Sequence, residues 1–228
     1  MDAVAGSVVL PGDVLGVVSG DVQLRLGPGV RVEHAKILAS KFGVLRFRKP
    51  NIYWIDINHK KYAPLVKERV IGVVIGKPGD NFRVDIGCSQ PGMLPYLAFE
   101  GATKRNRPNV QIGDLLYCEI NVANKDMEPE LVCIDHSGKA HGMGVLSTDG
   151  FMFRCSLGLA QKLLADKCPI LKLLSSHFSF EIAVGMNGCV WVKSKSVANT
   201  IIISNIVENS EFLSLDELEM MVNQVAKA

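Results

Sequence analysis

The sequence predicts a mainly β protein with an α+β part at its C-terminal end, and three observations indicate this. Short apolar runs separated by glycine, proline or asparagine follow one another up to about residue 135. Runs with helical periodicity begin only after about residue 156. At 228 residues, 48% hydrophobic and 21% charged, the chain is long enough for two or three small cores and lacks the composition of disordered or collagen-like proteins.

Residues 1–66 form the first predicted domain, a small β lobe. Glycines punctuate strand-like apolar runs in this part, and no helical period appears. The runs expected to form strands are 22–26, 36–39, 44–47 and 52–57.

Residues 67–140 form the second predicted domain, a small barrel. Strand-like runs at 70–75 and 82–86 are joined by a turn rich in proline, glycine and asparagine, and further runs follow at 115–122 and 131–134. The charged segment 101–110 precedes the two later runs. This arrangement is typical of a Greek-key barrel of the OB type, whose loops and strand face bind oligonucleotides.

Residues 141–228 form the third predicted domain, in which strands and helices alternate. Strands are expected at 151–155, 180–184 and 189–193, helices at 157–165 and 170–177, and two more helices at the end of the chain. Ser214 and Glu217 have the spacing of a capping box at the start of the last helix. Its apolar stripe, expected to be buried, comprises Leu215, Leu218, Met221 or Val222, and Val225.

The tetrapeptide Gly185-Met186-Asn187-Gly188 has the Gly-x-x-Gly pattern that clamps nucleotides in KH domains. Such a clamp opens a helix, whose free N–H groups face the phosphates, whereas here a β run follows. We therefore expect a hairpin turn, since Asn187 and Gly188 are both able to adopt positive φ. Trp191, in the apolar strand after the turn, is expected to pack in the core or between domains and to anchor the last module.

The most informative segment for function is 101–110, in which Lys104, Arg105 and Arg107 occupy three of four consecutive positions. The segment has no hydrophobic periodicity, so we expect a solvated loop whose cations can bind phosphate oxygens without reading a base sequence. Pairing of these cations with an acidic partner subunit is an equally weighted alternative. Asn106, a further candidate for RNA contact, can hydrogen-bond phosphate or stabilise the loop, and the second role is favoured.

The polar residues elsewhere predict neither a metal site nor catalysis. Cys133, His136 and His141 lack a fourth nearby zinc ligand. Asp80 and Asp85, the nearest acidic pair in the barrel, are not expected to converge on two metal ions. No cofactor is expected. Six scattered cysteines without a Cys-x-x-Cys pair are interpreted as reduced thiols, several of them in the core.

The net charge of +2 is unevenly distributed along the chain. Residues 1–66 carry nine Lys and Arg against five Asp and Glu, a net +4, whereas the other two parts each carry a net −1. A basic surface this local favours weak nucleic-acid contact assisted by partners. The chain start lacks the basic and apolar pattern of a secretory signal, and no run is apolar enough to span a membrane, so a soluble intracellular protein without membrane partners is expected.

Three segments carry a resemblance to a known family. They are Glu100-Gly-Ala-Thr-Lys-Arg-Asn-Arg-Pro-Asn-Val110, Asn124-Lys-Asp-Met-Glu-Pro-Glu130 and Gly185-Met-Asn-Gly188. With a β lobe, an OB barrel and an α/β module in this order, the chain closely resembles the exosome component three family, cap subunits of the eukaryotic RNA exosome. The resemblance covers nearly the whole chain.

This resemblance implies an N-terminal domain, an S-one-type OB domain and a KH domain in a non-catalytic RNA-binding subunit. Such a subunit would sit with the other cap subunits on a ring of RNase-PH-like subunits and guide single-stranded RNA to an associated 3′-to-5′ exonuclease. The resemblance further implies roles in rRNA processing, mRNA turnover and non-coding RNA degradation, and a location in nucleus, nucleolus and cytoplasm.

The barrel departs from a generic S-one domain in its stacking residues. Many such domains offer two aromatic side chains and a histidine on which bases stack. Here we expect Phe82 to fill one aromatic position, while Pro95 replaces the histidine, which favours loose tracking of RNA over tight binding. Arg83 is expected to point outward, either to RNA or to an ordinary cross-strand ion pair.

Three functions remain open from the sequence. The first is a non-catalytic subunit that guides RNA, and the second is an architectural subunit without RNA contact. The third is a nuclease, indicated only by the RNA-type domains.

Overall fold

The computed structural model describes residues 5–18, 24–57, 60–124, 126–165 and 168–225. The chain divides into two compact units, residues 1–59 and 60–228. No helix within the described ranges has the length and apolar character needed to cross a bilayer.

The first unit consists of two small sheets that share one core. One sheet has the strand order β1-β6-β7-β3 and the other the order β2-β5-β4. The bounds are β1 Val8–Val9, β2 Val14–Val17, β3 Arg25–Leu26, β4 Val30–Glu33, β5 Lys36–Ala39, β6 Gly43–Arg48 and β7 Ile52–Asp56. Apolar residues from both sheets meet between them, namely Val9, Leu15, Ile37, Ala39, Leu45 and Ile55. The predicted β lobe is confirmed; residues 22 and 23 of the predicted strand 22–26 lie outside the described residues.

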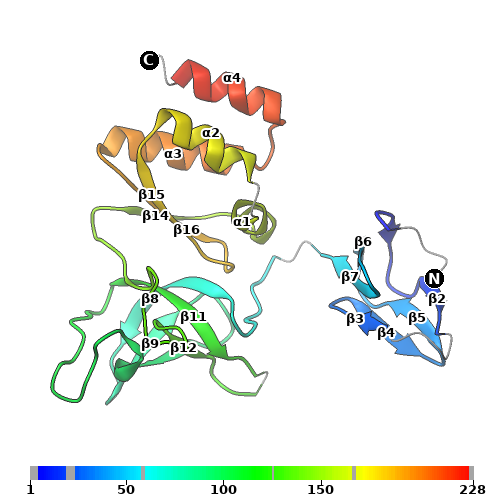
Figure 1. The fold of residues 1–228 in the computed structure, drawn as a ribbon, viewed down its shortest axis with the longest axis horizontal. Helices are drawn as coiled ribbons and strands as arrows, with labels where there is room; N and C mark the ends of the chain where they lie inside the picture. Colours follow the sequence, from blue (N-terminus) through cyan, green and yellow to red (C-terminus); the bar gives the residue numbers. More distant parts are fainter. Residues whose placement is uncertain (1–4, 19–23, 58–59, 125, 166–167, 226–228) are drawn as a thin grey trace. The chain divides into compact units, whose positions relative to one another are not determined.

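The second unit begins with a closed five-stranded barrel, drawn in cyan and green in Figure 1. Its strands are β8 Arg69–Gly76, β9 Asn81–Asp85, β10 Gly92–Pro95, β11 Leu115–Val122 and β12 Glu130–Val132. The sheet order β12-β10-β9-β8-β11 is closed by the pairing of β11 with β12. Alternate side chains point into the barrel, as in β9, where Phe82 and Val84 are buried between exposed neighbours. The predicted OB-type barrel is confirmed.

Two strands of this sheet are absent from the sequence prediction. β10 was missed because it is short and contains glycine and proline, which are depleted in strands. β13 (Gly144–Val145) pairs with β11 in antiparallel orientation. The barrel sheet therefore extends past residue 140, the predicted end of this domain.

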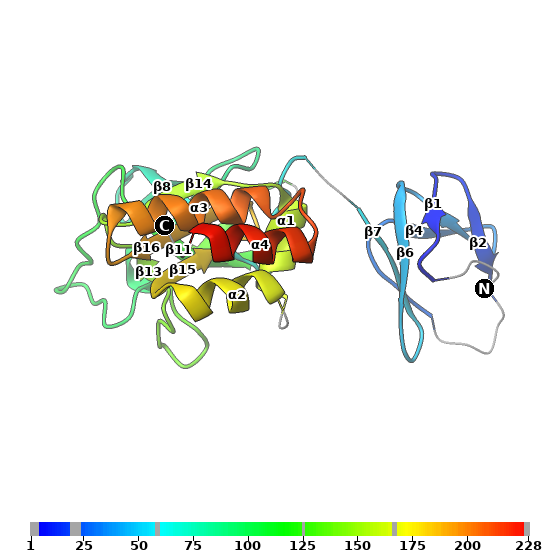
Figure 2. The same ribbon diagram turned by 90° about the horizontal axis from the view of Figure 1, so that it is seen from above.

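The third part is a three-stranded antiparallel sheet covered by helices on one face. The strand order is β14-β16-β15, with β14 Phe151–Arg154, β15 Phe180–Val184 and β16 Cys189–Ser194. The helices are α1 Leu157–Leu164, α2 Pro169–His177, α3 Val197–Asn209 and α4 Leu215–Val225. α2 and α3 lie over the face of the sheet that is turned away from the barrel, and α4 forms an outer layer on both (Figures 1 and 2). The chain order β-α-α-β-β-α, followed by the additional helix α4, agrees with the predicted KH-like module.

The last helix is fixed by its cap and by its apolar face. The N–H of Ser214 donates to Glu217 Oε2 at 2.9 Å and the N–H of Glu217 donates to Ser214 Oγ at 3.5 Å, which confirms the capping box. Leu218 and Val222 are fully buried in the same core as α2 and α3, while the side chains of Leu215 and Val225 lie outside the description. The described part of the apolar stripe, Leu218, Met221 and Val222, therefore packs in the core of its own domain.

Candidate nucleic-acid interface

The cationic segment forms an exposed loop between the short 3-10 helix η1 (Tyr96–Ala98) and β11. The loop has internal order: the N–H of Asn106 donates to Thr103 Oγ1 at 2.9 Å, and the N–H of Thr103 donates to the carbonyl of Asn106 at 3.0 Å. Asn106 Nδ2 also donates to the carbonyl of Gly101 at 3.3 Å. Asn106 thus stabilises the loop, as its sequence position suggested. Val110, buried in the barrel core, fixes the far end.

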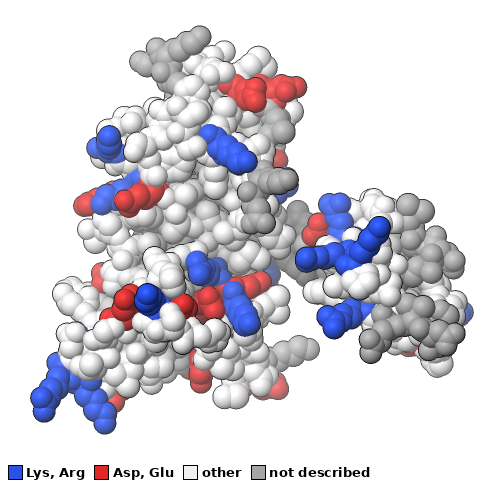
Figure 3. Space-filling model, viewed as in Figure 1, with Lys and Arg blue, Asp and Glu red and all other residues white. Residues whose placement is uncertain are grey.

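Lys104 and Arg105 form the free tip of this loop. Both are exposed, and neither makes a side-chain hydrogen bond or ion pair with any residue that the structure describes. In Figure 3, Lys and Arg side chains project from the lower left of the barrel, where Figure 1 draws the green loop. These two cations are free to bind an external anion.

Arg107 is also exposed, but contacts its own domain on two sides. Its Nη2 lies 3.2 Å from Asp80 Oδ1, in the turn between β8 and β9. Its guanidinium carbon lies over the ring of Tyr96, 4.8 Å from the ring centroid, which is a cation–π contact. The backbone N–H of Tyr96 in turn donates to the carbonyl of Asp80 at 3.1 Å. Neither partner could be predicted, because no sequence pattern links positions 80, 96 and 107.

Phe82 does not lie on the binding face, and the expectation that it stacks on a base is wrong. Its side chain is only 8% exposed and points into the barrel, where its ring meets Phe99 edge to face with centroids 6.0 Å apart. The strand alternation explains the error. Asn81, Arg83 and Asp85 take the outward positions of β9, so the aromatic ring at position 82 must point inward.

The outward face of β9 and β10 carries little free positive charge. Arg83 points outward as expected, and its Nη2 lies 3.8 Å from Glu128 Oε1, a residue of the β11–β12 loop rather than of a neighbouring strand. Beside this pair lies a hollow of about 420 Å³ lined by Asn81, Met93, Pro95, Met127, Glu128 and Glu130. An apolar and acidic lining of this kind does not attract a polyanion.

The tetrapeptide at 185–188 forms the predicted hairpin between β15 and β16. The N–H of Gly188 donates to the carbonyl of Gly185 at 3.0 Å, and the N–H of Gly185 donates to the carbonyl of Cys189 at 2.8 Å. Of the two residues able to adopt positive φ, only Gly188 does so, with a φ of +78°, whereas Asn187 has a negative φ. The turn is therefore of the three-residue type with one left-handed glycine.

Asn187 attaches this hairpin to the barrel. Its Nδ2 donates to the carbonyls of Ile71 at 2.7 Å and Ile86 at 2.9 Å, and its Oδ1 accepts from the N–H of Ile71 at 3.4 Å. The N–H of Met186 also donates to the carbonyl of Arg69 at 2.8 Å. Because the side-chain amide of Asn187 and the N–H of Met186 form hydrogen bonds with the barrel, the hairpin has a structural role.

Trp191 packs between the barrel and the last module, as expected. It is 4% exposed and clusters with Ile71, Cys189, Leu115 and Tyr117. Its indole covers Gly150 so closely that a Cβ built there would lie 2.2 Å from Cε2. The contact therefore requires glycine at position 150.

The position that could clamp RNA in a KH module is the connection that opens α2. In this chain it is the segment 165–168, Ala-Asp-Lys-Cys, which contains no glycine, and residues 166 and 167 lie outside the description. The N-cap Cys168 makes no side-chain cap bond, and Pro169 removes one N–H from the first turn of α2. A glycine-dependent clamp of the Gly-x-x-Gly kind therefore cannot form here.

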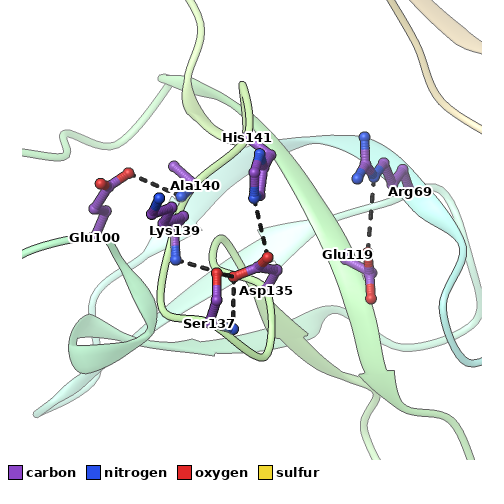
Figure 4. Close-up of polar contacts among 8 residues, drawn as sticks. All are labelled: Arg69, Glu100, Glu119, Asp135, Ser137, Lys139, Ala140 and His141. Atoms are coloured by element: carbon purple, nitrogen blue, oxygen red, sulfur yellow. Dashed lines mark hydrogen bonds and ion pairs between the residues drawn. The ribbon is translucent and has the colours of Figure 1, made fainter.

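The loop between β12 and β13 is organised around Asp135, as Figure 4 shows. Asp135 Oδ1 accepts from the N–H of Ser137 at 2.8 Å, from Ser137 Oγ at 2.7 Å and from the N–H of Lys139 at 3.0 Å. These hydrogen bonds, led by that from the Ser137 hydroxyl, lower the pKa of Asp135 to about 2. His141 Nε2 lies 3.0 Å from Asp135 Oδ2, so His141 pairs with a carboxylate.

Within the described ranges, no group of three or more His, Cys, Asp or Glu side chains is placed to hold a metal ion. Cys133 is buried in the barrel core, away from the exposed His136. Asp80 pairs with Arg107, while Asp85 accepts from the N–H of Gly87 at 2.9 Å, so the two carboxylates serve separate turns. Four of the six cysteines are buried and all six are free thiols.

Family models match all three parts of the chain. The model described as the N-terminal part of mammalian exosome complex component RRP40 matches residues 7–58, and the model of the RRP40 S1 domain matches residues 62–144. A KH domain model matches residues 150–198. Exosome complex component RRP40 of Bos taurus is 48% identical over 208 residues, which cover 89% of this chain and 76% of that protein.

The chain belongs to the RRP40 family of exosome complex components. The RRP40 protein of Drosophila melanogaster is 39% identical over 93% of both chains, and that of Saccharomyces cerevisiae is 36% identical over 85% of this chain and 84% of that protein. A solved structure described as an exosome complex RNA-binding protein shares the fold, with a TM-score of 0.60 and 18% identity over 73% of this chain and 96% of that chain.

The RRP40 S1 match includes the residues around the cationic loop. Asp80, Tyr96 and the segment 101–110 all fall within residues 62–144. The hairpin at 185–188 and Trp191 fall within the KH match. The contacts described above thus join the S1 and KH parts of an RRP40-family chain.

Proposed function

We propose that this chain is a non-catalytic subunit that guides single-stranded RNA into the exosome, and that it does so through the loop at 101–110. The observation that carries the proposal is the exposure of Lys104 and Arg105 without a partner among the described residues. Free cations on an ordered loop bind phosphates whatever the base sequence. The proposed route ends at an associated 3′-to-5′ exonuclease, in RNA processing and turnover.

The other surfaces support this choice of loop. The outward face of β9 and β10 has its arginine paired with Glu128, and the segment 165–168, which opens α2 of the KH module, contains no glycine. The cationic loop is therefore the described surface of the S1 barrel best suited to a polyanion. Contact through so few cations gives weak binding, which suits a strand that must slide.

The test is charge reversal of the loop tip in the assembled exosome. Replacing Lys104, Arg105 and Arg107 with Glu should leave assembly intact and reduce RNA protection and degradation. A matched control reverses three exposed lysines of the KH module, Lys162, Lys172 and Lys195. Unchanged RNA protection in the loop variant, with normal assembly, would refute the proposal.

An architectural subunit without RNA contact is the second candidate, favoured by the inward Phe82 and the paired Arg83. For this function the cations of the loop would bind an acidic partner subunit. The same loop variant would then fail to assemble, or would show no effect on RNA.

We further propose that the N-terminal unit binds RNase-PH-like ring subunits, beside the other cap subunits. Residues 1–59 carry seven Lys and Arg against five Asp and Glu, a net +2, and this unit exposes large apolar side chains, including Val8, Leu10, Val14, Phe42 and Phe47. The apolar residues Leu218 and Val222 of α4 are buried in the core of their own domain and are not available to a partner. Co-purification with a ring heterodimer should survive changes on α4 and be lost on deletion of residues 1–59.

The proposed locations are nucleus, nucleolus and cytoplasm, and the proposed absence of catalysis applies to the isolated chain. Fractionation of cells that express the tagged chain tests the proposed locations.

Incubation of the purified chain with magnesium and single-stranded RNA tests the proposed absence of catalysis, since degradation of the RNA would refute it.

A further inference from the structure

The guanidinium of Arg107 is held in a fixed position by two contacts of different kinds. Asp80 Oδ1 accepts from Nη2 at 3.2 Å, which fixes one edge of the group. The ring of Tyr96 lies beneath it, with 4.8 Å between the guanidinium carbon and the ring centroid. The N–H of Tyr96 donates to the Asp80 carbonyl at 3.1 Å, so the two partners are also tied to each other.

The backbone on both sides of Arg107 limits its movement. Asn106 is bonded to Thr103 and to Gly101 within the loop. Pro108 follows directly, and its fixed φ restricts the chain before Val110 enters the core. The side chain therefore leaves a loop that is already ordered.

One face of the guanidinium remains open to solvent. The Arg107 side chain is 60% exposed, although it touches both Asp80 and Tyr96. Tyr96 is itself buried, so its ring is covered by the barrel and by Arg107 rather than offered to a ligand. The surface that a ligand meets here is the planar, positively charged outer face of Arg107.

We propose that Arg107 and Tyr96 together form a stacking platform for one unpaired base of single-stranded RNA. Nucleobases stack on the planes of arginine guanidinium groups as well as on aromatic rings. Among the described residues of β9 and β10, no aromatic side chain points outward, because Phe82 points inward. The Arg107–Tyr96 platform supplies a flat surface at the loop instead, and Asp80 is its positioning residue.

This inference rests on the proposed function and assigns Arg107 a role that differs from that of its neighbours. Lys104 and Arg105 meet phosphates, for which only charge matters. A stacked base requires a plane. Lysine at position 107 keeps the charge and can still pair with Asp80, but it loses the plane, so Arg107→Lys separates the two roles.

The experiment compares two probes on the full-length chain at low salt. One probe is oligoadenylate, and the other is an abasic ribose-phosphate oligomer of the same length. Arg107→Lys should weaken oligoadenylate binding by about fivefold or more, as removal of a base stack does, and should leave binding of the abasic oligomer unchanged. The matched control Arg105→Lys should change the affinity for both probes by the same factor.

Three results would overturn the platform. If Arg107→Lys weakened the binding of both probes equally, Arg107 would be a phosphate contact. If it weakened the binding of neither probe, Arg107 would not belong to the site. In both cases the proposed RNA contact would stand. Failure of the wild-type chain to bind either probe would overturn the RNA contact together with the platform.

A second measurement detects the stacked base directly. The Nε–Hε resonance of Arg107 should move upfield on addition of oligoadenylate, because the adenine ring current acts on atoms above the ring plane, and should not do so with the abasic oligomer. The Nε–Hε resonance of Arg105 is the internal control. Equal shifts of the Arg107 signal with both probes would contradict stacking.

Discussion

Arg107 and Asp80 form an ion pair of 3.2 Å across 27 residues of sequence, and the pair joins the cationic loop to the turn between β8 and β9. The ring of Tyr96 lies beneath the guanidinium, and the backbone N–H of Tyr96 donates to the carbonyl of Asp80. The loop that carries the free cations is thereby fixed to the end of the barrel.

Replacing Asp80 with Asn should release Arg107 with little loss of stability. Both side chains are more than half exposed, and exposed ion pairs contribute about 0–1 kcal/mol. The Nε–Hε resonance of Arg107 should sharpen and move toward the random-coil position, while the free energy of unfolding changes by less than about 1 kcal/mol. A large loss of stability with an unchanged Arg107 signal would show that Asp80 acts on the fold instead.

Replacing Asn187 with Ala should loosen the junction between the barrel and the KH module. The change leaves the carbonyls of Ile71 and Ile86 without their donor, which costs about 1–3 kcal/mol. Hydrogen exchange of β8 and β16 amides should become faster. Asn205→Ala, at an exposed position of α3, is the control and should have an effect within about 0.5 kcal/mol. Equal exchange rates in both variants would contradict the role of Asn187.

Replacing Gly150 with Ala should destabilise the same junction by displacing Trp191. The new Cβ would lie 2.2 Å from Trp191 Cε2, and overpacking of this kind costs about 1–3 kcal/mol. Gly76→Ala is the matched control, because a Cβ at position 76 meets nothing within 4 Å. Thermal unfolding followed through tryptophan fluorescence should separate the two variants, and equal midpoints would refute the packing argument.

The loop between β12 and β13 should lose its order only in strong acid. Hydrogen bonds from Ser137 and Lys139 lower the pKa of Asp135 from its usual 3.8 to about 2. A carboxyl with a lowered pKa stabilises the fold above its unfolded-state value, and this contribution is lost as the pH falls through about 2. The amide shifts of Ser137 and Lys139 should titrate with that midpoint, and Asp135→Asn should abolish the transition. A midpoint near 3.8 would contradict the hydrogen bonding.

Local chemistry allowed much of the fold to be predicted from sequence. The strands β5, β11 and β15 match their predicted bounds because each is a run of apolar or alternating residues between turn residues. The last helix begins after Ser214 because Ser214 and Glu217 cap it reciprocally. β10 could not be predicted, since the pairing with β9 and β12, rather than propensity, makes Gly92–Pro95 a strand.

The candidate site was less predictable because its contacts join distant segments. Exposure of Lys104, Arg105 and Arg107 followed from their spacing, but nothing in the sequence links Arg107 to Asp80 and Tyr96. Phe82 was misassigned because the register of β9, which decides which side chains point inward, is set by its neighbours in the barrel. The role of Asn187 depends on contacts with residues more than a hundred positions away.

The most direct test of the account is photocrosslinking of single-stranded RNA to the assembled exosome, with the crosslinked residues of this subunit mapped by mass spectrometry. We predict that crosslinks concentrate in residues 101–110, at Lys104, Arg105 and Arg107. Crosslinks on the outward face of β9 and β10 with none in the loop, or no crosslink in this subunit, would contradict it.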